Sequence, residues 1–152
     1  MSSNAEVRAA RPGEEAALLE LYEWLFAPPA SRPASFEERR AAVALREAIA
    51  SHDACVLVAE AAEGELVGIC TAYQDLHSVR FGPRAWVEDL AVAPAHRSRG
   101  VGKALLDAVK AWARERGASH LELDTAEERR DAQRFYERES PARRSISYGW
   151  EL

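Results

Sequence analysis

Cysteine is scarce in this chain of 152 residues, which contains only Cys55 and Cys70. Neither lies in a CxxC pair, so the cysteines predict no zinc ribbon and no thioredoxin-type site. If a hairpin sets Glu60 opposite Glu65, the same register sets the two cysteines opposite each other, and a disulfide could form. Because the cytosol is reducing, we expect two buried thiols instead.

Long apolar runs are also missing from the sequence. No stretch approaches the roughly 20 residues that a membrane-spanning helix needs, and residues 1–11 lack the apolar core of a signal peptide. We therefore expect a cytoplasmic protein that has no membrane partner.

The chain has no excess of basic residues, since 20 Lys and Arg face 25 Asp and Glu, for a formal net charge of -5. Neutralising phosphates supplies most of the nonspecific affinity for nucleic acid, so we expect no nucleic-acid partner. The composition, 47% hydrophobic and 30% charged, is that of a globular chain. The length predicts a single domain, 1–152, whose core needs neither a disulfide nor a structural metal.

Apolar periodicity and turn residues predict the order of helices and strands. A Ser-x-x-Glu capping box at residues 35–38 marks one helix start. Two strands around the turn at residues 63–64 read as a hairpin, and residues 74–84 read as a polar loop. The order predicts an α/β fold with one mixed, mostly antiparallel sheet and helices on both faces. The expected strands are 6–9, 55–59, 66–71, 85–93, 120–124 and 145–151, and the expected helices follow Gly13 and span 35–51, 100–117 and 131–139.

The segment that follows the strand at 85–93 carries the clearest chemical signal. It is a basic loop with Arg97 and Arg99, leading into a helix opened by Gly100 and Gly102. Free amides at a helix start attract anions, and glycines let phosphates approach the backbone. Residues 94–117 hold six basic and two acidic side chains. An anionic ligand is therefore expected at this loop.

Two common phosphate motifs do not fit this segment. A P-loop needs four residues between its glycines, and a dinucleotide fingerprint needs a third glycine where Leu105 stands. The Arg-x-x-Gly-x-Gly signature instead resembles the GCN5-related N-acetyltransferase (GNAT) family. The resemblance implies acetyl-CoA as cosubstrate, with its pyrophosphate on the loop amides and its pantetheine paired along the preceding strand. It assigns cofactor binding to Leu90, Ala91, Val92, Arg97, Ser98, Arg99, Gly100, Val101, Gly102 and Lys103.

The same resemblance suggests two catalytic residues. Strand alternation predicts that Glu88 shares a face with Trp86, Leu90 and Val92, away from Asp89, and makes Glu88 the candidate base, unless it only orients the substrate. Residues 132–137 resemble the family's Ala-x-x-Phe-Tyr-Glu helix. They make Tyr136 the candidate acid for the departing thiolate, unless its ring is only a core aromatic. The sequence departs from the family at two places, Arg129 and 140–141.

The acceptor is expected to be a cationic amine. Residues 60–92 hold six acidic and two basic side chains, and Asp75 and Glu88 could attract an ammonium group, with Tyr73 and His77 as further contacts. We predict direct acetyl transfer to a primary amine of a small molecule, without a metal. The alternatives are a peptide or protein acceptor and an inactive CoA-binding sensor. Homodimers are frequent in the family, and residues 145–150 could pair between subunits.

Overall fold

The computed structural model describes residues 4–152, apart from the side chains of Leu76 and His77. Within these residues, five strands form one sheet in the order β1-β2-β3-β4-β5. The first three pairings are antiparallel and β4 with β5 is parallel, which confirms the predicted mixed α/β fold. The elements are β1 (Glu6–Ala9), α1 (Glu15–Phe26), α2 (Glu38–Ala50), β2 (Ala54–Glu60), η1 (Ala62–Gly64), β3 (Leu66–Ser78), β4 (Gly82–Val92), η2 (Pro94–His96), α3 (Val101–Glu115), β5 (His120–Glu122) and α4 (Arg130–Arg138).

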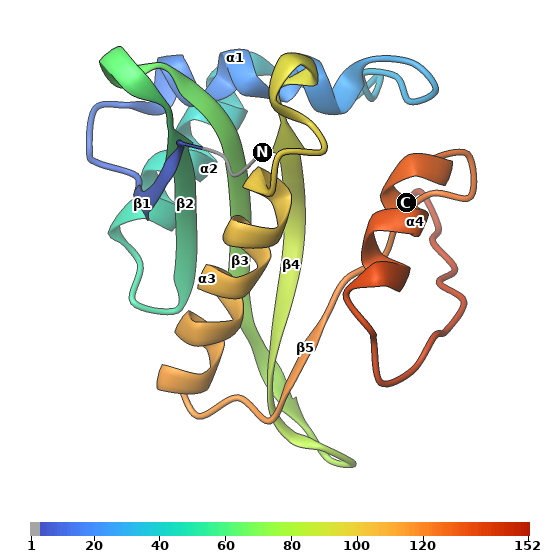
Figure 1. Ribbon diagram of the computed structural model, residues 1–152. Helices are drawn as coiled ribbons and strands as arrows, with labels where there is room; N and C mark the ends of the chain where they lie inside the picture. Colours follow the sequence, from blue (N-terminus) through green and yellow to red (C-terminus); the bar gives the residue numbers. More distant parts are fainter. Residues whose placement is uncertain (1–3) are drawn as a thin grey trace.

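Helices cover both faces of the sheet, as Figure 1 shows. On one face, α1 and α2 pack Leu18, Leu21 and Leu45 against strand residues that include Ile69. On the other face, the apolar stripe of α3, with Leu105 at its centre, packs against the opposite side chains of the same strands. Because successive strand residues point to opposite faces, the mostly apolar stretches 54–59 of β2 and 66–72 of β3 can contribute to both cores.

The predicted polar loop at residues 74–84 is wrong, because β3 and β4 extend through it as one long hairpin. Their pairing runs through Asp75 opposite Arg84 to Ser78 opposite Gly82. Asp75 and Arg84 also form an ion pair across the strands, an arrangement that stabilises antiparallel pairs. Residues 74–84 are polar because this end of the hairpin extends beyond the helices that cover the sheet. The alternation of apolar and polar residues alone could not predict strands there.

The predicted register of the β2–β3 hairpin is also wrong. A short 3-10 helix, η1, lengthens the turn, and the pairing is already irregular before it, between residues 59 and 60. As a result Cys55 lies opposite Ala72, and Cys70 lies opposite Leu57. Both thiols are free and buried, so the prediction of two buried thiols is confirmed.

Two further sequence expectations fail at element ends. Helix α2 begins at Glu38 without a side-chain cap, and the carbonyl of Ser35 instead accepts a hydrogen bond from Arg40, so no capping box forms. Residues 145–151 form no strand, and their alternating apolar side chains are exposed. Ser147 of this tail donates a 3.1 Å hydrogen bond to Asp124, two residues beyond the end of β5.

The contact of β3 with α3 depends on Gly68. A Cβ at this position would lie 2.9 Å from Leu105 Cδ1 and 3.1 Å from Val101 Cγ1, and both side chains are fully buried. We expect Gly68→Ala to lower the free energy of unfolding by about 1 to 2 kcal/mol through overpacking. Urea denaturation would measure this change. Gly149→Ala is the control, since nothing lies within 4 Å of its Cβ, and an equal effect of both variants would contradict the packing argument.

Candidate functional site

The loop between β4 and α3 has backbone amides without internal partners. Helix α3 begins after Gly100, whose φ of 85° lies in the left-handed region that glycine adopts without strain. Ser98 also has a positive φ, of 59°. Within residues 4–152, no backbone carbonyl accepts a hydrogen bond from the amides of residues 98–103. These amides at a helix start are therefore available to an anion, as the sequence predicts.

The three basic side chains of this loop have different surroundings. Arg97 and Arg99 are exposed, and Arg97 Nε donates a hydrogen bond of 3.2 Å to the carbonyl of Val92. Lys103 Nζ instead lies 3.0 and 3.5 Å from two carboxylates. The arginines thus offer their charge to a ligand directly, whereas the lysine already shares its charge within the protein.

Helix α4 packs against the start of α3 through a glycine. A Cβ on Gly102 would lie 3.4 Å from the ring of Phe135, so this ring lies next to the start of α3. The next residue, Tyr136, is partly buried. Burial, followed by the nearby Cys70, raises the pKa of Tyr136 to about 12, against the opposing effect of Arg129. The phenol therefore stays protonated near neutral pH and can donate a proton.

Strand β4 loses its parallel neighbour before it reaches the loop. β5 pairs only with residues 84–86 of β4, and beyond this point the two strands diverge in Figure 1 toward α3 and α4. Residues 90–92 continue β4 with a partner on the β3 side only. Their other edge is open to an extended ligand, which fits the predicted pairing of pantetheine along this strand.

A β-bulge at Glu88 changes which side chains share a face. Thr71 pairs with Asp89 and Ala72 pairs with Val87, so Glu88 has no partner on β3. Leu90 packs into the core under α3, whereas Asp89 reaches Tyr22 of α1 on the other face. The prediction that Glu88 shares the face of Leu90 and points away from Asp89 is therefore wrong, because a bulge breaks the period-two alternation.

The two carboxylates instead form one cluster with two hydroxyl groups. The Tyr22 hydroxyl donates to Asp89 Oδ2 at 2.8 Å, and Thr71 Oγ1 lies 3.4 Å from the same oxygen. Desolvation raises the pKa of Asp89, although these bonds oppose the rise. Desolvation, followed by the charge of Asp89, raises the pKa of Glu88. Glu88 itself is exposed enough to meet a ligand from solvent.

Arg129 connects this cluster to α4. Its Nη2 atom donates a 2.7 Å hydrogen bond to the carbonyl of Leu25 near the end of α1. Its charge also favours the ionised forms of Asp89 and Tyr136, since it lowers the pKa of each. The departure from the family pattern at this position therefore places a cation between the two candidate catalytic regions.

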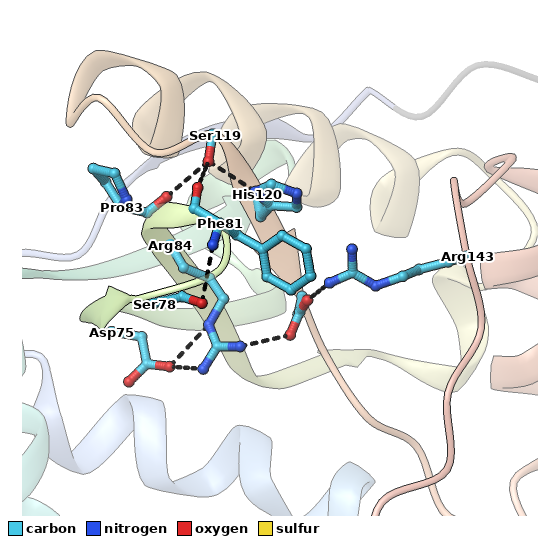
Figure 2. Close-up of polar contacts among 9 residues, drawn as sticks. Asp75, Ser78, Phe81, Pro83, Arg84, Ser119, His120 and Arg143 are labelled. Atoms are coloured by element: carbon cyan, nitrogen blue, oxygen red, sulfur yellow. Dashed lines mark hydrogen bonds and ion pairs between the residues drawn. The ribbon is translucent and has the colours of Figure 1, made fainter.

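The predicted acceptor residues do not all come together. Tyr73, which is 39% exposed, lies with its hydroxyl 3.5 Å from Glu88 Oε2. Asp75 instead pairs with Arg84, which also bonds Glu122, in the network of the hairpin arm shown in Figure 2. The side chain of His77 lies outside the described residues.

Sequence reasoning missed the hydroxyl and guanidinium partners of the carboxylates. Tyr22 falls on the apolar stripe of α1 and looks like a core aromatic, and Thr71 lies in an apolar strand. Only Arg129 carried a signal, because it departs from the family pattern. Without the fold, nothing placed these three side chains near Asp89.

Among the described residues, no three His, Cys, Asp or Glu side chains are grouped so that they could hold a metal ion. Likewise, no helix in residues 4–152 combines the length and the apolar character that a membrane crossing requires.

Comparisons with known proteins agree on one family. A sequence model described as the acetyltransferase (GNAT) family matches residues 17–140. Aminoglycoside N(6')-acetyltransferase type 1 of Stenotrophomonas maltophilia is 32% identical over 128 residues, which are 82% of this chain and 78% of that protein. The uncharacterized N-acetyltransferase YhdJ of Bacillus subtilis is 41% identical over 59 residues, 39% of this chain and 42% of the relative. The chain spans at most 62% of the length of this relative and two others that it matches.

A solved structure gives the same answer for the fold. AAC(6')-Iy in complex with the bisubstrate analogue CoA-S-monomethyl-acetylneamine superposes with a TM-score of 0.80, at 21% identity, over 99% of this chain and 100% of that chain.

Proposed function

Because the chain belongs to the GNAT acetyltransferase family, we propose that it transfers the acetyl group of acetyl-CoA directly to a primary amine of a small cationic molecule. The observation that carries the proposal is the loop at residues 98–103, which follows the end of β4 with its backbone amides free, while the carboxylates of Glu88 and Asp89 lie within the same strand. The relative named for aminoglycosides and the structure with a CoA analogue support it.

The remaining parts of the proposal rest on the sequence. The enzyme would act as a single domain, 1–152, in the cytoplasm, without a metal ion and without a nucleic-acid or membrane partner. A homodimer fits the exposed apolar tail, in which Ile146 and Trp150 are about 80% exposed.

The residues of this site fit acetyl-CoA: some would bind the cofactor, and others would transfer protons. The amides of residues 98–103, with Arg97 and Arg99, would hold the pyrophosphate, and residues 90–92 would hold the pantetheine. Acetyl-CoA supplies the activated thioester. Glu88, exposed and with a raised pKa, would accept the proton of the acceptor ammonium directly or through water. Tyr136 would donate its proton to the departing thiolate.

Thiol release from acetyl-CoA, measured with a panel of small amines and peptides, tests the proposal. Release with small amines, and acetylated amine as the product, would support it. Release with peptides alone would assign the acceptor to polypeptides. Thermal stabilisation by CoA without thiol release from any acceptor would favour a sensor and contradict the proposed function.

The role of Tyr136 predicts a moderate loss on removal of its hydroxyl. A thiolate leaves readily, because thiols have a reference pKa near 8.5. We therefore expect Tyr136→Phe to lower kcat about tenfold, below the usual contribution of a general acid, with little change in KM for acetyl-CoA. Steady-state kinetics of thiol release measure both constants. An unchanged kcat would remove Tyr136 as the acid.

A further inference from the structure

The segment that joins α1 to α2 places an arginine beside two aromatic rings that contact each other. Arg32 Cζ lies 5.4 Å from the ring centroid of Phe26 and 5.1 Å from that of Phe36. The two rings meet edge to face, with centroids 5.0 Å apart and an interplanar angle of 70°. Glu23 completes the surroundings with an ion pair to the guanidinium. Two ring faces and a carboxylate are the components of a binding site for an organic cation.

This arrangement is open to solvent. The side chains of Arg32 and Glu23 are 52% and 60% exposed. An exposed ion pair and exposed cation-π contacts hold a side chain only weakly. Arg32 can therefore leave the rings without unfolding the protein, and another cation can take its place.

Tyr22 connects the rings of Phe26 and Phe36 to the carboxylates of Glu88 and Asp89. The rings of Phe26 and Tyr22, one helical turn apart, have centroids 6.1 Å apart. The hydroxyl of Tyr22 donates a hydrogen bond to Asp89, the residue next to Glu88 on β4. One face of α1 thus joins the proposed acceptor carboxylates to the aromatic rings.

The segment between α1 and α2 also lies in the fold where a connection between the rings and the carboxylates requires it. In Figure 1 the segment between α1 and α2 extends past β4 on the side where β5 and α4 lie. The hydrogen bond from Arg129 to the Leu25 carbonyl confirms that the end of α1 meets the start of α4. The rings therefore border the side of the sheet where β4 and β5 diverge.

We propose that Phe26, Phe36 and Glu23 form a second cation subsite, occupied in the free protein by Arg32 and taken over by the distal cation of a dicationic acceptor. This inference rests on the proposed function and narrows the acceptor class to amines with two positive charges. The proximal ammonium would meet Glu88 and lose its proton, while the distal one stays charged beside the two rings, where Arg32 now lies. Arg32 then acts as an internal competitor that weakens the binding of dications.

The test compares α,ω-diaminoalkanes of increasing length with n-alkylamines of matching length. We expect Arg32→Gln to lower the KM for the preferred diamine about fivefold to tenfold, because the competitor is gone, while the KM for the monoamine stays unchanged. Adding Phe26→Leu and Phe36→Leu to this variant should abolish the preference for diamines. Arg39→Gln in α2 is the matched control, since Arg39 makes no ion pair or ring contact among the described residues.

Isothermal calorimetry with the same diamines, on the complex with CoA, gives a readout that does not need turnover. Tighter diamine binding by Arg32→Gln and weaker binding by the variant without both rings would support the subsite. Equal diamine affinity in Arg32→Gln and the control would overturn it, as would an equal gain for monoamines. If no amine releases thiol with the unmodified protein, the proposed function fails, and calorimetry still decides the subsite separately.

Discussion

Replacing Gly102 by aspartate is expected to raise the Kd for CoA about 100-fold or more while the protein stays folded. The new carboxylate would add a negative charge to the first turn of α3, next to the free amides of residues 98–103, where it repels phosphate and weakens its hydrogen bonds to these amides. The loss of two charge-assisted hydrogen bonds, at about 1.5 kcal/mol each or more, corresponds to this factor. An acidic side chain in the first turn of a helix is stabilising, so α3 should not suffer.

The control for this variant is Gly102→Ala. A Cβ at this position would lie 3.4 Å from Phe135, an ordinary contact distance, so alanine tests the added methyl group without the charge. We expect at most a few-fold change in Kd for alanine. Calorimetric titration with CoA at low and high salt measures both variants, and the gap between them should shrink as salt screens the charge. Equal Kd values for aspartate and the unmodified glycine would contradict the assignment of the loop.

The loop could be predicted from the sequence because its determinants are local. The helix predicted at 100–117 exists as Val101–Glu115, since an apolar stripe opens at Gly100 and closes at Gly117. A strand, a basic loop and two glycines in succession leave few other arrangements. Membership of the GNAT family, predicted from the same signature, is confirmed by the match over residues 17–140.

The hairpin arm and the acidic cluster could not be predicted for the opposite reason. The polar residues of 74–84 form two paired strands in which Asp75 faces Arg84, and this pairing depends on the register of the hairpin rather than on the pattern along either strand. The bulge at Glu88 inserts one residue into β4 and leaves no trace in the alternation of the chain itself. One extra residue in a strand moves all the side chains beyond it to the opposite face of the sheet. This shift places Asp89 on the face of α1, where its hydrogen-bond partners lie.

Substitutions of the neighbouring carboxylates Glu88 and Asp89 are expected to have clearly different effects on kcat. We expect Glu88→Gln to lower kcat by about 100-fold to 1000-fold, because the amide cannot accept the ammonium proton. The acid limb of the pH profile of kcat/KM should vanish with it. Asp89→Asn should keep most of kcat, since the Asn carbonyl can still accept the bond from Tyr22.

The pH profile of Asp89→Asn separates the two carboxylates. A base works only when deprotonated, so kcat/KM rises with pH through the pKa of the base. Desolvation and the charge of Asp89 both raise the pKa of Glu88, which places this limb above the usual range of a glutamate. Removing that charge should lower the pKa of Glu88 and move the limb to lower pH. A large loss of kcat in Asp89→Asn, with a mild effect of Glu88→Gln, would make Asp89 the base instead.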